Sequence, residues 1–257
     1  MAADKGEMSF LDHLDVLRGS IIRSLLAVLL LMIVGLSFRE ILFDKLILLP
    51  SKPDFVTYRW FHLNQPIQIV NLDISGQFMV HLRASLMLGL VLGFPYIIFE
   101  AWKFIAPALY PNEKKGVGGA FLLSSLLFYV GVAIGYFILL PVCLAFFQGY
   151  TVSDAITNSF SLGSYMSMFG SMVLMIGLIF EFPVLIMILS RIGVVGRTML
   201  RKGRKYALVI IMILSALITP ADLGSMIIVT IPLYGLYELS ILFCRKEETN
   251  EAEYDID

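Results

Sequence analysis

The sequence predicts an all-α integral membrane protein with six transmembrane helices, both chain ends in the cytoplasm, and a short fifth and sixth helix that form a hairpin. Composition is the first observation behind this prediction: 58% of the 257 residues are hydrophobic, 15% are charged, and the mean hydropathy is +0.85. A soluble domain averages about 45–50% apolar and about 25% charged residues. The other two observations are a series of long apolar runs and the uneven distribution of basic residues around them.

The apolar runs give the number and bounds of the predicted spans. A helix rises about 1.5 Å per residue, so about 20 apolar residues cross roughly 30 Å of hydrocarbon. Four runs meet this length comfortably. The fifth would reach only about 20 Å, and the sixth is interrupted by Pro232 and Glu238. The predicted spans are 20–38, 81–99, 117–140, 165–189, 206–218 and 223–243.

Lysine and arginine residues set the predicted orientation. If both ends of the chain are cytoplasmic, 14 of these residues fall on the cytoplasmic side and four on the outside, all four in the first loop. Cytoplasmic loops of membrane proteins carry the excess of basic residues. The segment "FIAPALYPNEKK", residues 104–115, is therefore predicted to face the cytoplasm.

The segments around the spans carry smaller predictions. Apolar residues at helical spacing before Pro50 predict a short amphipathic helix along the outer membrane surface. The stretch "IQIV" is predicted to be extended. Residues 1–244 are predicted to form a single membrane domain, and 245–257 an acidic, disordered cytoplasmic tail.

Several function classes find no support in the residues. The net charge of −1 argues against nucleic acid as a partner. Cys143 and Cys244 form no metal-binding or disulfide spacing, and the three histidines fall on different segments. Motifs of metalloproteases, redox centres and phosphate-binding loops are missing from the sequence. We therefore expect neither an enzyme nor a cofactor or metal site.

Glu181 is the most unusual residue, because apolar neighbours surround it within the fourth predicted span. A carboxylate at that depth costs about 2.5–3.5 kcal/mol, so it must face protein or water, or be protonated. It is either a neutral, hydrogen-bonded core group near Pro183 or a polar site for a substrate or a proton. A proton- or ion-coupled transporter or channel for a small solute, using Glu181, is thus an alternative function. A structural scaffold for other membrane proteins is a second.

Two stretches on the cytoplasmic side also carry polar residues in an informative pattern. "FLDHLDVLRGSIIRS" has apolar residues at helical spacing beside Asp12, Asp15 and Arg18, which predicts an amphipathic helix that runs into the first span. In "FIAPALYPNEKK", the lysines are explained by topology and the aromatic residues by an interface. Glu113 is explained by neither, so it is either a solvated surface residue or a ligand for a cation.

Four stretches together resemble the TatC family, the C subunit of the twin-arginine translocase, over roughly residues 9 to 244. "FLDHLDVLR" resembles its N-terminal motif, and "EAWKFIAPALYPNEKK" its first cytoplasmic loop. "GLIFEFPV" resembles the Phe-Glu-x-Pro signature of its fourth span, and "ITPADLGSMIIVTIPLYGLYE" its last outside turn and sixth span. The four occur in the family's order, on the predicted helices and loops.

The resemblance implies a receptor in the cytoplasmic (inner) membrane that binds twin-arginine signal peptides and helps to export folded proteins using the proton-motive force. Implied partners are TatA- and TatB-type single-span subunits and membrane lipid, in a hetero-oligomer with several copies. The implied signal-peptide residues are Glu113, Phe104, Leu109 and Tyr110, with Asp12, Asp15 and Arg18 in the N-terminal motif. Glu181 maps onto the intramembrane glutamate. Implied structural or partner contacts are Pro50, Ala216, Leu217, Thr219 and Asp222.

One departure from the family pattern concerns the acidic residue of the N-terminal motif, whose place is taken here by Val16. Asp15 is adjacent but about 100° round the helix, whereas Asp12 lies one turn back on the same face. Either aspartate supplies the second negative charge, or Glu113 acts with less help.

Overall fold

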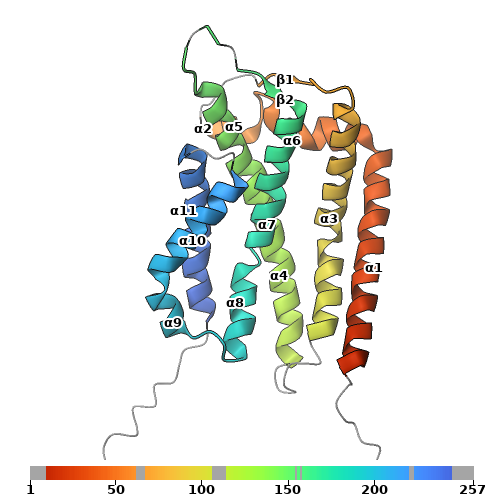
Figure 1. The fold of residues 1–257 in the computed structure, drawn as a ribbon, viewed down its shortest axis with the longest axis vertical. Coiled ribbons are helices and arrows are strands. Elements are labelled where there is room, and N and C mark those ends of the chain that lie inside the picture. The colour runs from red at the N-terminus through yellow and green to blue at the C-terminus, as the bar shows by residue number, and fades with distance from the viewer. Residues whose placement is uncertain are drawn as a thin grey trace, which may run out of the picture.

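The protein is described here from a computed structural model, which places residues 10–61, 67–105, 114–153, 155–156, 158–219 and 223–244. Its long helices stand side by side as a bundle (Figure 1). Helix α1 (Phe10–Ser37) forms one edge and packs along α3 (Gly76–Ile105). Helices α10 (Arg204–Ile218) and α11 (Leu223–Phe243) form the opposite edge.

The two central spans are less regular than the sequence predicts. Each includes a π-helical segment, and the second is also broken near Glu181, where the helix restarts with Pro183 in its first turn. Proline has no N–H to donate, so it begins a helix more readily than it continues one. The first is α4 (Lys114–Ile134), η5 (Gly135–Leu139) and α5 (Leu140–Gly149); the second is α6 (Leu162–Gly170), η6 (Ser171–Met175), α7 (Ile176–Ile179) and α8 (Phe182–Arg191).

Five helices in the described part of the chain are long and apolar enough to cross a membrane. Helix α10, with 15 residues, is too short to be among them, so the count of six spans stays a prediction. Helix α11 was expected to be short, but it runs for 21 residues through Pro232 and meets the criterion. Only the fifth helix is therefore short. Helices α10 and α11 pack against each other as the predicted hairpin.

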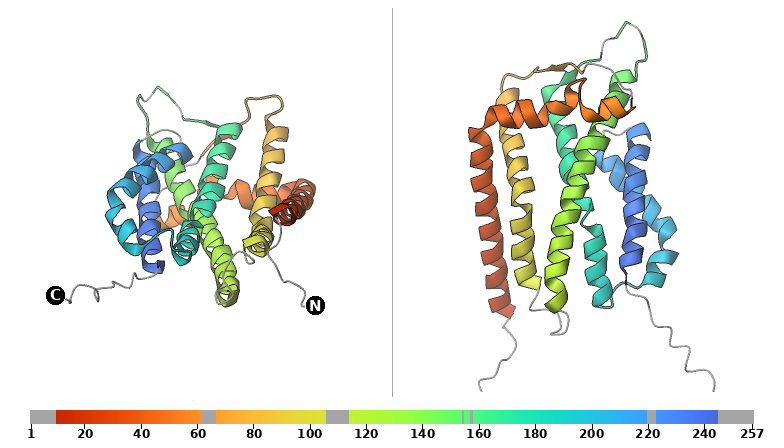
Figure 2. Two further views of the ribbon diagram at one scale, coloured as in Figure 1. Left: turned by 60° about the horizontal axis from the view of Figure 1, so that its bottom comes forward. Right: turned by 180° about the vertical axis from the view of Figure 1, so that it is seen from behind.

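A layer of short elements crosses one end of the bundle, which we call the capped end (Figure 2, right). It consists of η1 (Ile41–Ile47), η2 (Leu49–Ser51) and α2 (Val56–Phe61), and the strand β1 (Ile69–Val70) continues it. The predicted helix before Pro50 is present as η1, and the last two residues of "IQIV" form β1. That η1 lies along the membrane surface stays a prediction. Strand β1 also pairs in parallel with β2 (Phe160–Ser161), which joins two loops at the capped end that the sequence did not connect.

Tyrosine hydroxyls attach the capped end to the spans. The Tyr136 hydroxyl donates to the Leu46 carbonyl oxygen at 2.7 Å, and that of Tyr165 donates to the Ile47 carbonyl oxygen at 2.5 Å. These bonds satisfy backbone oxygens of a π-helix that lies across the bundle rather than within it.

The opposite end of the bundle, called the basic end, holds the start of α1, the end of α3 and the short helix α9 (Arg197–Lys202). The last described turn of α11 also lies there (Figure 1). The start of the first span and the end of the last thus share one end, as an even number of crossings requires. The side of the membrane on which this end lies stays a prediction.

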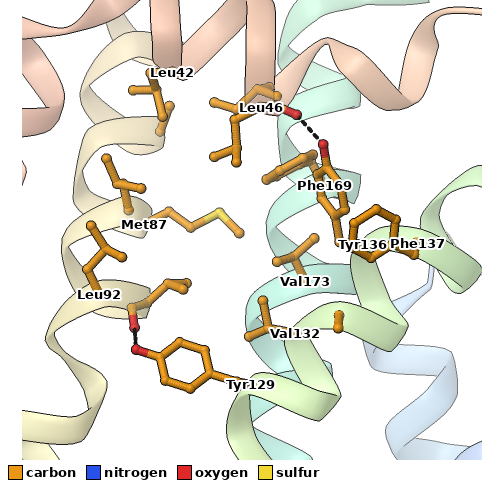
Figure 3. Close-up of a pocket in the computed structure, with 15 residues that line it drawn as sticks. Leu42, Leu46, Met87, Leu92, Tyr129, Val132, Tyr136, Phe137, Phe169 and Val173 are labelled. Atoms are coloured by element: carbon orange, nitrogen blue, oxygen red, sulfur yellow. Dashed lines mark hydrogen bonds between the residues drawn. The ribbon is translucent and has the colours of Figure 1, made fainter. Parts of the chain in front are cut away.

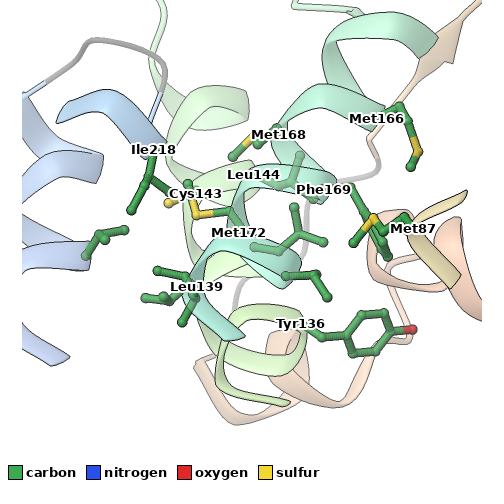
Figure 4. Packing of buried hydrophobic residues seen from close by; sticks show 14 of the residues in the cluster. Met87, Tyr136, Leu139, Cys143, Leu144, Met166, Met168, Phe169, Met172 and Ile218 are labelled. Atoms are coloured by element: carbon green, nitrogen blue, oxygen red, sulfur yellow. The ribbon is translucent and has the colours of Figure 1, made fainter. Parts of the chain in front are cut away.

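The core lies between the two irregular spans and α11 (Figure 4). Leu140, Leu144, Met172 and Ile176 are fully buried there, beside Cys143. Helix backbones approach closely where glycines recur four residues apart, as in "GLVLG" and "GVAIG". Small residues at this spacing allow such contact in membranes.

Two of these glycines leave no room for a side chain. A Cβ at Gly135 would lie 2.0 Å from the Met172 carbonyl oxygen, and one at Gly89 would lie 2.7 Å from the Val28 carbonyl oxygen. Both obstacles are backbone atoms of a neighbouring span, which cannot rotate away. Close helix contact therefore holds α1 on α3 and η5 on η6.

Of two reporter enzymes fused between Gly193 and Lys205, only the one that is active in the cytoplasm should show activity. The reason is that this segment carries basic residues at the basic end. Paired fusions of a periplasm-active and a cytoplasm-active reporter would measure this. The matched control is a fusion at Lys52, in the capped end, which should give the opposite pattern. Activity of an exported reporter at 193–205 would contradict the orientation.

Candidate functional site

The segment that carries Glu113 joins α3, which ends at Ile105, to α4, which begins at Lys114, at the basic end. Glu113, Leu109 and Tyr110 lie outside the described residues. Phe104, from the same motif, is half-buried in the last turn of α3. The elements on either side of the predicted recognition loop are therefore defined, whereas its contacts are not.

The N-terminal motif forms the first turns of α1, which runs without a break into the span, as predicted. Asp15 and Arg18 are exposed at the basic end, and the side chain of Asp12 lies outside the described residues. Val16, where the family has an acidic residue, is also exposed, at 38%. The structure brings neither aspartate of this motif into a described ion pair.

A second carboxylate does lie near these residues, and it is Glu100. Its side chain is 2% exposed on α3, and one carboxylate oxygen accepts a hydrogen bond from Arg23 Nη2 of α1 at 2.6 Å. The Arg23 guanidinium also donates to Ser20 Oγ at 3.2 Å, and Lys103 Nζ lies 3.5 Å from the other Glu100 oxygen. This cluster joins α1 to α3 one turn before Phe104.

Our sequence reasoning missed Glu100 because the predicted second span ended at Phe99, which left Glu100 to the loop. Helix α3 continues to Ile105, so Glu100 belongs to the helix. It is buried there, in contact with Arg23 of α1. The sequence did contain a signal for Glu100, because an acidic residue next to a long apolar run is costly unless it has a partner. The same argument selected Glu181.

A groove between α1 and α3 begins at this cluster. It has a volume of about 430 Å³, and its walls are apolar apart from Ser20, Ser24 and the Glu100 carboxylate. Phe104 of the predicted recognition motif lines the same groove. The groove thus offers one negative group at the basic end and an apolar surface along the spans.

Glu181 lies at the break between α7 and α8 and is partly buried. Ser124 Oγ of α4 donates a hydrogen bond to Glu181 Oε2. The other oxygen, Oε1, is buried and has no hydrogen-bond partner among the described residues. Among the described residues, the site therefore has one carboxyl oxygen without a hydrogen-bond partner inside the bundle.

A cavity of about 300 Å³ lies beneath η1, between α3 and the two irregular spans (Figure 3). The hydroxyl of Tyr136 bonds to the Leu46 carbonyl at its upper edge, and that of Tyr129 bonds to the Val91 carbonyl below at 3.2 Å. The other lining side chains that Figure 3 labels are apolar. No charged residue is among the lining residues described, so the cavity suits an apolar chain rather than an ion.

The remaining predicted site residues that the structure describes lie in η2 and at the end of α10. Pro50 is buried, and its carbonyl oxygen accepts a hydrogen bond of 2.7 Å from Tyr58, whose burial raises the pKa of its hydroxyl. On α10, Ala216 and Leu217 are exposed, and Leu217 is 77% exposed. Thr219 is instead buried and donates to the Ser215 carbonyl at 2.9 Å.

Ala216 and Leu217 therefore lie on the outer surface of the α10–α11 edge, whereas Thr219 packs inside it. Asp222 lies outside the described residues. A partner role for this edge stays a prediction.

Comparison with known proteins gives the family. A profile of the Sec-independent protein translocase protein (TatC) matches residues 12–232. The chain belongs to the TatC family. A TatC of Blattabacterium sp. subsp. Periplaneta americana is 36% identical over 94% of this chain and 96% of its own. One from Escherichia coli (strain K12) is 34% identical over 71% of this chain and 70% of its own.

Solved structures agree with this assignment. A crystal structure of a twin-arginine translocase receptor TatC covers 90% of this chain and 97% of its own, with a TM-score of 0.75 and 31% identity. A second, in the detergent DDM, has a TM-score of 0.77 and 30% identity. This member of the family is therefore a multi-pass membrane protein and a translocase component, not an enzyme. The match does not favour the small-solute transporter.

Proposed function

We propose that this TatC is the receptor subunit of a twin-arginine translocase in the cytoplasmic membrane. It binds twin-arginine signal peptides at the basic end, which faces the cytoplasm, and acts in the export of folded proteins. The likeness to a twin-arginine translocase receptor over 90% of the chain carries this proposal. The excess of lysine and arginine at the basic end supports the orientation.

Recognition in this proposal depends on Glu113, with Phe104, Leu109 and Tyr110 in the same motif. A guanidinium presents forked donors that match a carboxylate at two points, and the lysine ammonium cannot reproduce that geometry. A carboxylate that aromatic neighbours shield from water attracts arginine more strongly than one in open water. Asp12, Asp15 and Arg18 lie in the first turns of α1 at the same end of the bundle.

The remaining parts of the proposal concern energy and partners. Glu181, with its unpaired buried oxygen, is the polar site inside the bundle, near which the apolar part of the signal peptide lies. Export uses the proton-motive force. TatA- and TatB-type single-span subunits join several copies of this chain, and the exposed residues of α10, including Ala216 and Leu217, offer them an apolar edge.

Replacing Glu113 with alanine should weaken twin-arginine peptide binding by about 1–3 kcal/mol, because a charge-assisted hydrogen bond is lost. The topology should not change, since the loss of an acidic residue only strengthens the positive-inside bias. The measurement is the Kd of a fluorescent signal peptide for the purified protein in nanodiscs.

The control for this experiment is Glu40→Ala, which removes an exposed glutamate at the capped end. It should leave the Kd unchanged. Glu113→Ala combined with Asp12→Ala or Asp15→Ala forms a double-mutant cycle. The coupling free energy for peptide binding should exceed about 0.5 kcal/mol for an aspartate that acts together with Glu113. If Glu113→Ala keeps the full preference for twin arginine over twin lysine, recognition by this loop is wrong.

A further inference from the structure

The Arg23–Glu100 pair has the chemistry of the interaction that the receptor is proposed to make with its peptide. A guanidinium from α1 binds a carboxylate on α3 at 2.6 Å, at the polar end of the α1–α3 groove. The two partners differ in exposure: the Glu100 side chain is 2% exposed, whereas that of Arg23 is 48% exposed. The carboxylate is therefore fixed in the protein, and the arginine is the partner that can leave.

Stabilising the contact between α1 and α3 does not explain why this ion pair is present. The two helices are already in close contact, since a Cβ at Gly89 would lie 2.7 Å from the Val28 carbonyl oxygen and one at Gly35 would lie 3.2 Å from the Ser85 Cα. Buried ion pairs add little net stability compared with apolar groups of similar volume. A buried carboxylate at this position therefore calls for another explanation.

The pair lies at the basic end, close to the point where α3 ends and the proposed recognition loop begins. Val16 replaces the acidic residue of the family's N-terminal motif, and Asp15 is exposed without a described ion pair. Glu100 precedes Phe104 by one helical turn, and both line the groove that continues along the spans with apolar walls. An arginine followed by an apolar segment matches such a groove in charge and in polarity.

We propose that Glu100 is the second carboxylate for the twin-arginine motif, and that Arg23 occupies it until a signal peptide arrives. This rests on the receptor function proposed above. One peptide arginine replaces Arg23 on Glu100, so a charge-assisted hydrogen bond is exchanged for an equivalent one. Arg23, half exposed, turns to water or to lipid phosphates. Arg23 thus acts as an internal competitor that a twin-lysine peptide displaces poorly.

Peptide binding to the full chain in nanodiscs tests this exchange. Arg23→Gln should lower the Kd for a twin-arginine peptide by about five-fold, the size expected for a half-exposed ion pair. Glu100→Gln should raise it by about ten-fold or more, as a charged hydrogen bond is lost. In the double variant, the gain from Arg23→Gln should vanish.

Arg204→Gln is the matched control, because Arg204 is also 48% exposed and binds Glu238 at 2.7 Å on the α10–α11 edge. It should leave the Kd unchanged. An unchanged or raised Kd in Arg23→Gln overturns the exchange when the wild type still prefers twin arginine over twin lysine. Loss of that preference in the wild type would instead overturn the receptor function itself.

A second measurement covers the case in which removing Glu100 unfolds the protein. A cysteine beside the peptide's arginine pair should form a disulfide with Ala101→Cys, which lines the groove, in an otherwise unchanged chain. Leu30→Cys, 64% exposed on α1 and not among the groove residues, should not react. Equal cross-linking at both positions, or none at Ala101→Cys, would show that the peptide does not enter the groove.

Discussion

A Gly135→Val protein should fail to accumulate in the membrane as a folded protein. The new Cβ would lie 2.0 Å from the Met172 carbonyl oxygen, so η5 and η6 would have to separate within the hydrophobic core. Overpacking costs about 1–3 kcal/mol and occasionally more. The backbone obstacle puts this change at the upper end. Thermal unfolding of the purified protein and its level in membranes would measure the loss.

The control is Gly119→Ala in α4 of the same span, where an added Cβ meets no atom within 4 Å. Alanine also favours helix over glycine by about 1 kcal/mol. This variant should therefore be at least as stable as the wild type. A Gly135→Val protein that unfolds at the wild-type temperature would show that the two spans do not approach as closely as described.

A Glu181→Lys protein should lose export, whereas Glu181→Gln should still accumulate. Glu181 lies ten residues before the end of α8, about 15 Å along the helix. A permanent positive charge at that depth costs about 2.5–3.5 kcal/mol. Glutamine is neutral and can still accept the hydrogen bond from Ser124.

Two assays separate the causes of that loss. Protein level in membranes reports assembly, and export of a folded twin-arginine reporter reports function. Glu40→Lys is the comparison, because Glu40 is exposed at the capped end and has no described ion pair, so it should tolerate the charge far better. A Glu181→Lys protein that assembles and exports normally would rule out a buried, constrained site. If Glu181→Gln assembles but does not export, the carboxyl group itself is required.

The candidate site was only partly predictable from the sequence. Glu181 could be found because a charge within an apolar span is costly. The short helix before Pro50 could be found because apolar residues recur there at helical spacing. Glu100 was not found in this way, because its importance depends on where α3 ends and on Arg23, which is 77 residues away in the chain. The glycine contacts were not predictable for the same reason. The motif "GVAIG" can be read from the sequence, but Met172, whose carbonyl oxygen leaves no room for a side chain at Gly135, belongs to another span.

The sequence by itself determined the class of protein, most of the spans, the short fifth helix and the family. Each of these follows from local composition or from motifs within one segment, since the cost of placing a residue in lipid depends mainly on that residue. Only the tertiary structure decided the β1–β2 pairing, the breaks within the central spans, the burial of Thr219 and the ion pair of Arg23 with Glu100. These depend on contacts between segments that are far apart in the sequence. The free energy of such a contact depends on both segments, so neither segment alone predicts it.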